Sequence, residues 1–281
     1  GRDRRQRQMC IRDSSSGLFF MNFQDNELYF IPLGGSEQFG VNLNIYGYKD
    51  RLLAVDMGIG FADEYFPGVD ILLPNPKFLE NHKHKLEGLI ITHAHEDHIG
   101  AVAYLWPRIQ CPIYCTSFTA AVLKKKLEEN PQCKEAEVNI IPFEKRFALG
   151  VFDLEFLPIT HSVPESCTVV LRTEYGQVVH SGDWNLDPSP VIDQKVDPKK
   201  FRVLGDSGVL AYIGDSTNSG VEGVSGSEHD VEEGLNTVIK ECSQGRIVVT
   251  IFSSNIGRIR SICKAAQANG RDVAVLGRSL H

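Results

Sequence analysis

Short apolar runs that alternate with turn residues dominate the first two thirds of the chain. They are rich in Val, Ile, Leu, Phe and Tyr and are bounded by Gly, Pro, Asn and Asp, which is typical of β-strands joined by turns. The predicted strands cover residues 28–33, 41–48, 51–56, 88–92, 112–116, 137–142, 151–157, 167–173 and 177–181. A helical stretch that begins near Asp97 and an amphipathic helix over 117–129 lie between them. This part of the chain is therefore predicted to be mostly strands, with helices between some of them.

After Pro188 the pattern changes to a regular alternation of strands and helices. A strand that ends at Asp215 and a polar Ser/Gly loop come first, and four further elements follow. These are a helix over 228–242, a strand over 246–252, a helix over 255–268 and a strand over 272–277. Strict alternation of this kind predicts a parallel sheet of the α/β class.

Composition excludes several classes of protein. No apolar run in the 281 residues approaches the ~18 residues of a membrane span, so we expect no membrane partner. Seven cysteines without a CxxC pair indicate a reducing compartment, and we expect a cytoplasmic protein. The net charge of −7 argues against a broad basic surface for nucleic acid. Any contact with nucleic acid must then be confined to a metal centre and a few arginines, or use sequence beyond this chain.

Residues 1–26 are basic at their start and lack the apolar core and small-residue cleavage site of an export signal. We interpret them as an unstructured tail, and an artefactual origin is one explanation for it.

Four ligand-type side chains follow the apolar strand over 88–92 within six residues. They are His93, His95, Asp97 and His98. In an extended backbone alternate side chains point the same way, so His93 and His95 can reach one ion while Asp97 and His98 reach a second. A single histidine is more often an ordinary polar residue than a ligand, but packing alone does not explain this cluster.

Further ligands must come from other segments. His161 and Asp183 each follow an apolar run that would hold them at the rim of a sheet, and Asp56 closes a third such run. We interpret Asp56 as a carboxylate that orients a ligand histidine. Imidazole and carboxylate ligands suit Zn²⁺ or Mn²⁺, so the sequence predicts a site for divalent metal ions.

The segment THAHEDHIGA resembles the signature of the metallo-β-lactamase superfamily, whose αββα fold binds two metal ions. The resemblance implies that His93, His95 and His161 bind one metal, that Asp97 and His98 bind the other, and that Asp183 bridges both.

Within the superfamily, PGVDILLPNPKFL, HSVPES, HSGDWNLDPSPV and GDSTNSG resemble ribonuclease J of the β-CASP nucleases. This likeness covers about residues 28–281 and implies a ribonuclease that hydrolyses RNA as a 5′ exonuclease, an endonuclease or both. It assigns 27–208 to an incomplete metallo-β-lactamase sandwich and 209–281 to the start of a β-CASP domain, with Asp215 as an acidic motif of that domain. Local chemistry alone also allows Asp215 to be a plain turn cap.

The family has later histidine motifs, one of which supplies the last metal ligand, and these do not occur here. We therefore expect an N-terminal fragment that is inactive alone, and a full-length protein that forms a dimer or tetramer.

The implied chemistry is attack of an activated water on phosphorus between two cations, with Asp97 and His98 as catalytic residues. Phosphate contacts are expected where strands meet helix N-termini. These positions are Ser253, Ser254, Asn255, Arg278 and Ser279. Ser and Asn are also ordinary N-caps, so that alternative stays open for the first three.

Two other functions remain open. One is a different hydrolase with the same metal core, a DNA nuclease or an enzyme acting on a thioester, lactone or β-lactam. The other is a metal-binding scaffold without activity. An inserted α/β domain around Asp215 favours the nuclease, and the predicted ligands that fall within this chain are all present, which argues against the scaffold.

Overall fold

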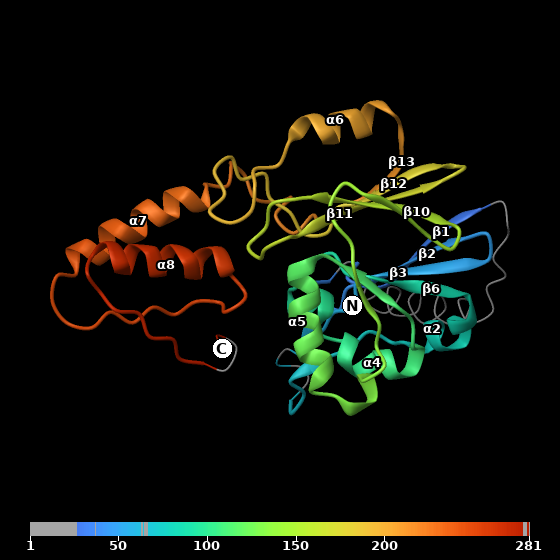
Figure 1. Ribbon diagram of the computed structural model, residues 1–281, viewed down its shortest axis with the longest axis horizontal. Helices are drawn as coiled ribbons and strands as arrows, with labels where there is room; N and C mark the ends of the chain where they lie inside the picture. Colours follow the sequence, from blue (N-terminus) through green and yellow to red (C-terminus); the bar gives the residue numbers. More distant parts are fainter. Residues whose placement is uncertain (1–26, 37, 63, 65–66, 278–279, 281) are drawn as a thin grey trace, which may run out of the picture.

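A computed structural model describes residues 27–36, 38–62, 64, 67–277 and 280. Two stacked sheets form its centre (Figure 1). The first sheet is six-stranded and mixed, because its first two pairings are antiparallel and the next three are parallel. Its order is β1 (Leu28–Gly34), β2 (Leu43–Tyr48), β3 (Arg51–Val55), β6 (Leu86–Ile90), β7 (Ile113–Cys115) and β8 (Val138–Ile140).

The second sheet has five strands, antiparallel except at one edge. Its order is β13 (Val209–Ile213), β12 (Gly176–His180), β11 (Cys167–Thr173), β10 (Phe152–Pro158) and β9 (Arg146–Leu149). The edge strand β13 pairs in parallel with β12. A further two-stranded sheet joins β4 (Gly60–Phe61) and β5 (Ile71–Leu72).

Alternation along the strands explains the stacking. Leu53, Val55 and Ile90 of the first sheet pack against Phe152 and Phe156 of the second in one buried cluster. The opposite face of the first sheet supports a second apolar cluster, which is covered by helices. Successive side chains of a strand point to opposite faces, and both faces of the first sheet carry apolar side chains. The face turned away from the second sheet therefore requires a covering layer of helices.

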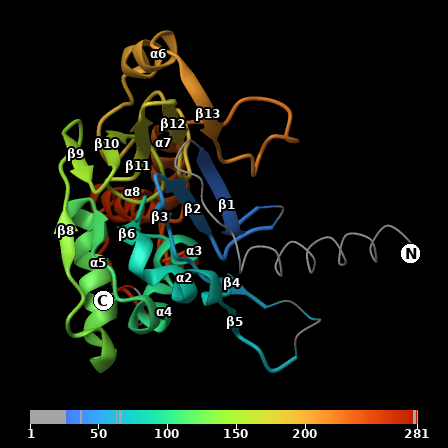
Figure 2. The same ribbon diagram turned by 90° about the vertical axis from the view of Figure 1, so that its right-hand side faces the viewer.

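Helices occupy the two outer layers (Figure 2). On the first sheet these are α2 (Lys77–His82), α4 (Val102–Ile109) and α5 (Ser117–Glu128), and on the second it is α6 (Pro198–Asp206). Leu204 of α6 packs against Val170 and Val179 of the second sheet. The layers thus follow the order helix, sheet, sheet, helix, as the family resemblance implies. Among the described residues no helix combines the length and the apolarity that a bilayer span requires.

Two helices lie beside this sandwich, α7 (Glu228–Glu241) and α8 (Ile256–Ala268), and they pack against each other (Figure 1). Each begins at a capping residue, Ser227 and Asn255, whose side chain accepts a hydrogen bond from a backbone N–H.

The strands predicted over 246–252 and 272–277 are wrong for this structure. The chain there has no ladder partner among the described residues, and apolar side chains such as Val248 (84 % exposed) and Leu276 (95 % exposed) face water. A strand forms only where a neighbour completes its hydrogen bonds, and an apolar pattern alone does not supply one.

The predicted domain boundary between residues 208 and 209 stays a prediction. β13 follows it directly and is nevertheless part of the second sheet of the sandwich. The predicted tail over 1–26 lies outside the described residues.

Candidate metal centre

The predicted ligands lie on loops at one edge of the sandwich. β3 and β6 are parallel neighbours, so Asp56 and the segment 93–98 both follow the C-terminal ends of strands on the same side of the first sheet. β10 and β12 both run antiparallel to the strand between them, so the loops carrying His161 and Asp183 also follow strand ends on one side of the second sheet. Sheet topology thus collects side chains that are far apart in sequence.

His93 to His98 lies at the predicted strand-to-helix junction. The backbone is still extended at His95, which is the N-cap of the short helix α3 (Glu96–Ile99). The backbone N–H groups of His98 and Ile99 both donate to the carbonyl of His95. This abrupt bend sends His93 and His95 in one direction and Asp97 and His98 in another.

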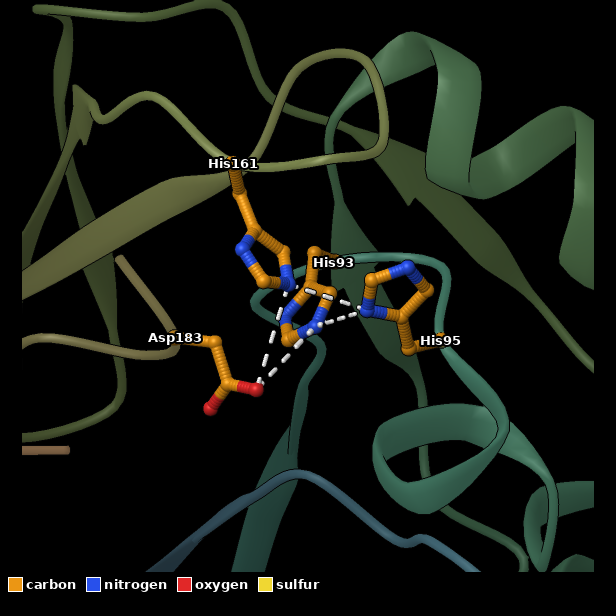
Figure 3. Close-up of side chains that lie close together, drawn as sticks. All are labelled: His93, His95, His161 and Asp183. Atoms are coloured by element: carbon orange, nitrogen blue, oxygen red, sulfur yellow. Dashed lines mark hydrogen bonds and ion pairs between the residues drawn. The ribbon is translucent and has the colours of Figure 1, made fainter. Parts of the chain in front are cut away.

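Four side chains form a first cluster, shown in Figure 3: His93, His95, His161 and Asp183. Nδ1 of His95 lies 3.1 Å from Nε2 of His93 and 3.0 Å from Nε2 of His161. Oδ2 of Asp183 lies 4.0 Å and 3.9 Å from those two Nε2 atoms. The structure therefore brings together the histidines predicted to share one ion.

Asp97, His98 and Asp183 form a second cluster beside the first. Nε2 of His98 lies 3.4 Å from Oδ2 of Asp97 and 3.3 Å from Oδ1 of Asp183. Asp183 thus offers one oxygen to each cluster, which is the position expected of a bridging carboxylate.

The donor atoms of the first cluster fit a divalent cation. Nitrogens held ~2.0–2.1 Å from a tetrahedral Zn²⁺ are themselves ~3.3 Å apart, close to the distances seen here. The hydroxyl of Thr92 donates its own proton to the Asp56 carboxylate. The hydroxyl oxygen lies 3.0 Å from Nδ1 of His93 and can therefore accept the Nδ1 proton of that ring. The arrangement leaves Nε2 of His93 as a bare lone pair directed at the cluster.

Asp56 holds His98 in place through the ring nitrogen that does not face the second cluster. It is 1 % exposed, and its Oδ1 accepts from the backbone N–H of Thr92 at 2.8 Å. Its Oδ2 lies 2.8 Å from Nδ1 of His98. A carboxylate at Nδ1 keeps the proton there and turns the Nε2 lone pair toward the site, which is the orienting role predicted for Asp56.

The pKa values of the histidines shift in two opposite directions. Burial, together with the neighbouring histidines, lowers the pKa of His161 to about 4 and that of His93 well below its ordinary value, so both rings are neutral ligands at pH 7. Burial opposes protonation of His98 as well, but Asp56 and its carboxylate neighbours outweigh it and raise the pKa of His98 well above the ordinary value.

The Asp183 carboxylate is held ionised. Burial alone would raise its pKa, but the hydrogen bond to His98 and the nearby histidines bring it down to about 2. The ionised Asp183 carboxylate therefore lies as a negative charge between the two clusters, which is what a site for cations requires.

Sequence reasoning missed two residues that contact the second cluster. The amide of Asn42 donates to the Asp97 carbonyl at 3.0 Å and lies 3.2 Å from Nε2 of His98. Gly58 passes so close to the same loop that a Cβ there would meet the Asp97 carbonyl oxygen at 1.5 Å. Neither carries a local signal, because both contacts depend on the packing of residues 42 and 58 against the ligand loop.

A third missed residue lies behind His95. The Ser162 hydroxyl is 3.3 Å from Nε2 of His95, and the backbone of Ser254 also hydrogen-bonds the His95 ring. The backbone N–H of Gly257 donates to the Ser162 carbonyl at 3.5 Å. The start of α8 is thereby tied to a candidate metal ligand.

The remaining predicted residues lie around this centre. Asp215 lines a cavity of about 370 Å³ that Asp97, His98 and Asp183 also line. Its Oδ1 accepts from the Thr217 N–H, so it caps a turn, and its motif role stays a prediction.

The predicted phosphate contacts Ser253, Ser254 and Asn255 line a cavity of about 800 Å³ next to His95. Asn255 caps α8 through the Arg258 N–H, which is the alternative that the sequence left open. Arg278 and Ser279 lie outside the described residues.

Comparison with known proteins places this geometry in a family. The model of the metallo-beta-lactamase superfamily matches residues 57–215, which is more than half of the chain. The chain belongs to the metallo-β-lactamase superfamily. A second model, the beta-CASP domain of ribonuclease J, matches residues 244–281. The sequence-based resemblance and fold class are thereby confirmed.

Several relatives carry the name Ribonuclease J. The protein from Sinorhizobium meliloti is 44 % identical over 92 % of this chain and 46 % of its own length. The protein from Thermus thermophilus is 38 % identical over 89 % of this chain and 45 % of its own length. The chain thus spans about half the length of the curated relatives it matches.

Among solved structures, a protein of unknown function from Enterococcus faecalis V583 superposes with a TM-score of 0.64. Its sequence identity is 16 %, and the match covers 84 % of this chain and 63 % of that one. At this identity the likeness concerns the fold alone.

Proposed function

We propose that this chain is the N-terminal part of a metal-dependent ribonuclease that cleaves RNA phosphodiester bonds with two divalent ions, Zn²⁺ or Mn²⁺. The observation that carries the proposal is Asp183, whose two oxygens face two separate ligand clusters on a chain similar to ribonuclease J. His93, His95 and His161 would hold one ion, and Asp97 with His98 the other.

Bound ions of this kind lower the pKa of a coordinated water and offset the negative charge that develops on phosphorus. The side chains of this chain do the rest. Asp97, whose pKa is lowered despite its burial, is ionised, and its carboxylate can take up the proton of an attacking water. Asp56 holds His98 in orientation, and Ser253, Ser254 and Asn255 would meet phosphate oxygens at the start of α8.

The proposal extends to the organisation of the full-length protein. Residues 27–208 belong to the metallo-β-lactamase domain, and 209–281 begin the β-CASP domain around Asp215. We expect a cytoplasmic homo-oligomer that acts on RNA. The 281 residues alone should bind the second ion weakly and cleave little RNA, and robust cleavage by this chain would contradict that expectation.

The test is digestion of matched 5′-monophosphorylated RNA and DNA by the full-length protein, with and without chelator. We expect RNA cleavage that chelation abolishes and metal restores. Asp97→Asn should lower turnover at least about a hundredfold while metal content changes less. Asp153→Asn is the matched control, because Asp153 pairs with Arg146 on the surface of the second sheet.

Two results would count against the proposal. Hydrolysis of lactones or thioesters without RNA cleavage would favour the small-molecule hydrolase, and cleavage of DNA alone would favour a deoxyribonuclease. Normal turnover in Asp97→Asn would remove that carboxylate from the mechanism.

A further inference from the structure

Two polar side chains close one end of the apolar cluster between the sheets. Asn44 lies on β2, two residues before Tyr46, and His180 ends β12, two residues after Val178. Tyr46 and Val178 belong to that cluster, and alternate side chains of a strand share a face, so Asn44 and His180 point into the same layer from the two sheets. They are 8 % and 7 % exposed, and both line the cavity of about 370 Å³ beside the second ligand cluster.

A buried hydrogen bond fixes the ring of His180. Its Nδ1 lies 2.9 Å from the hydroxyl of Tyr46, which has no other partner among the described residues. Burial raises the pKa of Tyr46 far above its ordinary value, so the hydroxyl keeps its proton and must donate it. Burial also lowers the pKa of His180 to about 4, and the ring is therefore neutral at pH 7. Nδ1 then accepts from Tyr46, and the ring proton of His180 lies on Nε2.

The free ends of both side chains face the cavity. Within the described ranges, neither Nε2 of His180 nor the amide of Asn44 has a hydrogen-bonding partner. The side-chain nitrogen atoms that the described residues seal from solvent without a partner belong to Asn139 and Arg172. Asn44 and His180 therefore reach the open space of the cavity. Two polar groups that are so deeply buried and unpaired, next to a candidate metal centre, indicate that a ligand completes their hydrogen bonds.

The two groups suit a hydroxyl. Nε2–H of His180 can only donate, whereas the amide of Asn44 can also accept, and a hydroxyl both accepts and donates. The carboxyl groups of Asp183 and Asp215 line the same cavity, and a carboxylate repels a phosphate but not a neutral hydroxyl. In a nucleic acid, the hydroxyl that lies close to each phosphate is the 2′-hydroxyl of ribose, which DNA lacks.

We propose that Asn44 and His180 bind the 2′-hydroxyl of the ribose next to the phosphodiester bond that is cleaved. His180 donates to the hydroxyl oxygen, and the amide oxygen of Asn44 accepts the hydroxyl proton. Tyr46 is a positioning residue, because its hydroxyl keeps the ring proton of His180 on Nε2. The pair lets the protein distinguish RNA from DNA. This inference rests on the proposed ribonuclease function.

Cleavage of RNA that carries one 2′-deoxynucleotide tests the site in the full-length, metal-loaded protein. The deoxynucleotide is placed in turn on either side of the bond, and at one of these positions kcat/KM should fall at least about tenfold. Asn44→Leu keeps a similar volume without hydrogen-bonding groups. It should cleave intact RNA more slowly by a comparable factor and lose little more on the deoxy substrate, because amide and hydroxyl act as one pair. Its metal content should stay at the starting value.

Tyr46→Phe tests the positioning role. The ¹⁵N chemical shifts of His180 should place the ring proton on Nε2 in the unsubstituted protein and show both tautomers in the variant. The variant should lower kcat/KM on intact RNA roughly two- to tenfold and show a smaller penalty for the deoxynucleotide. Asn139→Leu is the matched control, since Asn139 also has a buried amide but does not line this cavity. It should keep the full penalty.

The outcomes separate this inference from the ribonuclease proposal. If the unsubstituted protein does not cleave RNA, the ribonuclease proposal fails and the hydroxyl site with it. If it cleaves RNA but tolerates a deoxynucleotide on both sides of the bond, the hydroxyl site alone is refuted. The same holds if Asn44→Leu retains the full penalty. An unchanged tautomer of His180 in Tyr46→Phe removes the positioning role.

Discussion

Replacing Asp56 by asparagine should weaken the second metal site while leaving the first largely intact. The Thr92 backbone N–H and hydroxyl need an acceptor, so the amide oxygen of the substituted side chain must occupy the position of Oδ1. The amide nitrogen then faces Nδ1 of His98, which lies 2.8 Å from the carboxylate in the structure. An NH₂ group cannot accept a proton from Nδ1, so His98 changes tautomer and its Nε2 carries the proton.

The size of the effect follows from the contact that is lost. Loss of the group that orients a ligand histidine lowers metal affinity by about 10- to 100-fold, or roughly 1.4–2.7 kcal/mol. The variant keeps its acceptor for Thr92 and should remain folded. Asp56→Ala would instead leave two buried donors, the N–H and the hydroxyl of Thr92, unpaired at about 1–3 kcal/mol each, and should destabilise the fold as well.

Metal content after dialysis and competition with a chelating indicator measure both sites, and ¹⁵N chemical shifts report the tautomer of His98. Asp153→Asn serves again as the surface control. If Asp56→Asn retains two metals with unchanged affinities, the reasoning about the His98 tautomer is refuted.

Three further predictions concern two residues beside the candidate ligands and one buried thiol of the core. Gly58→Ala should destabilise the protein by several kcal/mol and weaken metal binding, because its Cβ would overlap the Asp97 carbonyl, and thermal unfolding measures this. Ser162→Ala should lower metal affinity up to about tenfold with an unchanged melting temperature, since only the hydroxyl at Nε2 of His95 is lost. Burial raises the pKa of Cys111 to about 12, so at pH 8 its thiol stays protonated and should resist iodoacetamide until the protein unfolds.

For each of these predictions, one result would contradict it. Gly234→Ala in α7 is the control for Gly58, because a Cβ there meets nothing within 4 Å, and equal melting curves for the two variants would count against the close approach. For Ser162, an affinity equal to that of the unsubstituted protein would remove the hydroxyl from the site. Rapid alkylation of Cys111 in the folded state would show that it is not buried.

Local patterns predicted the parts of the fold whose hydrogen bonds close over short distances. Period-2 alternation placed β11 at the residues where it occurs, and the ligand motif marked the bend between β6 and α3. The helix α6 was missed although its start carries a signal, with Asp197 as N-cap and Pro198 in the first turn. Its nine residues were too short for a clear apolar period.

Errors arose where a feature depends on distant neighbours. The apolar pattern over 246–252 and 272–277 is typical of strands, but a strand needs pairing partners, and the described chain has none there. Asn42 was missed for the same physical reason, because its contact with the loop of Asp97 joins residues 55 positions apart and leaves no pattern near residue 42.

The two ligand clusters draw on both sheets, and this makes an ion a cross-link between them. His93, His95, Asp97 and His98 extend from the first sheet, whereas His161 and Asp183 extend from the second. Binding free energy at such a site is thermodynamically linked to the association of the two halves of the sandwich. At an ion concentration one hundred times Kd the linkage amounts to about 2.7 kcal/mol. Metal supply would then set how firmly the layers hold together as well as whether chemistry can occur.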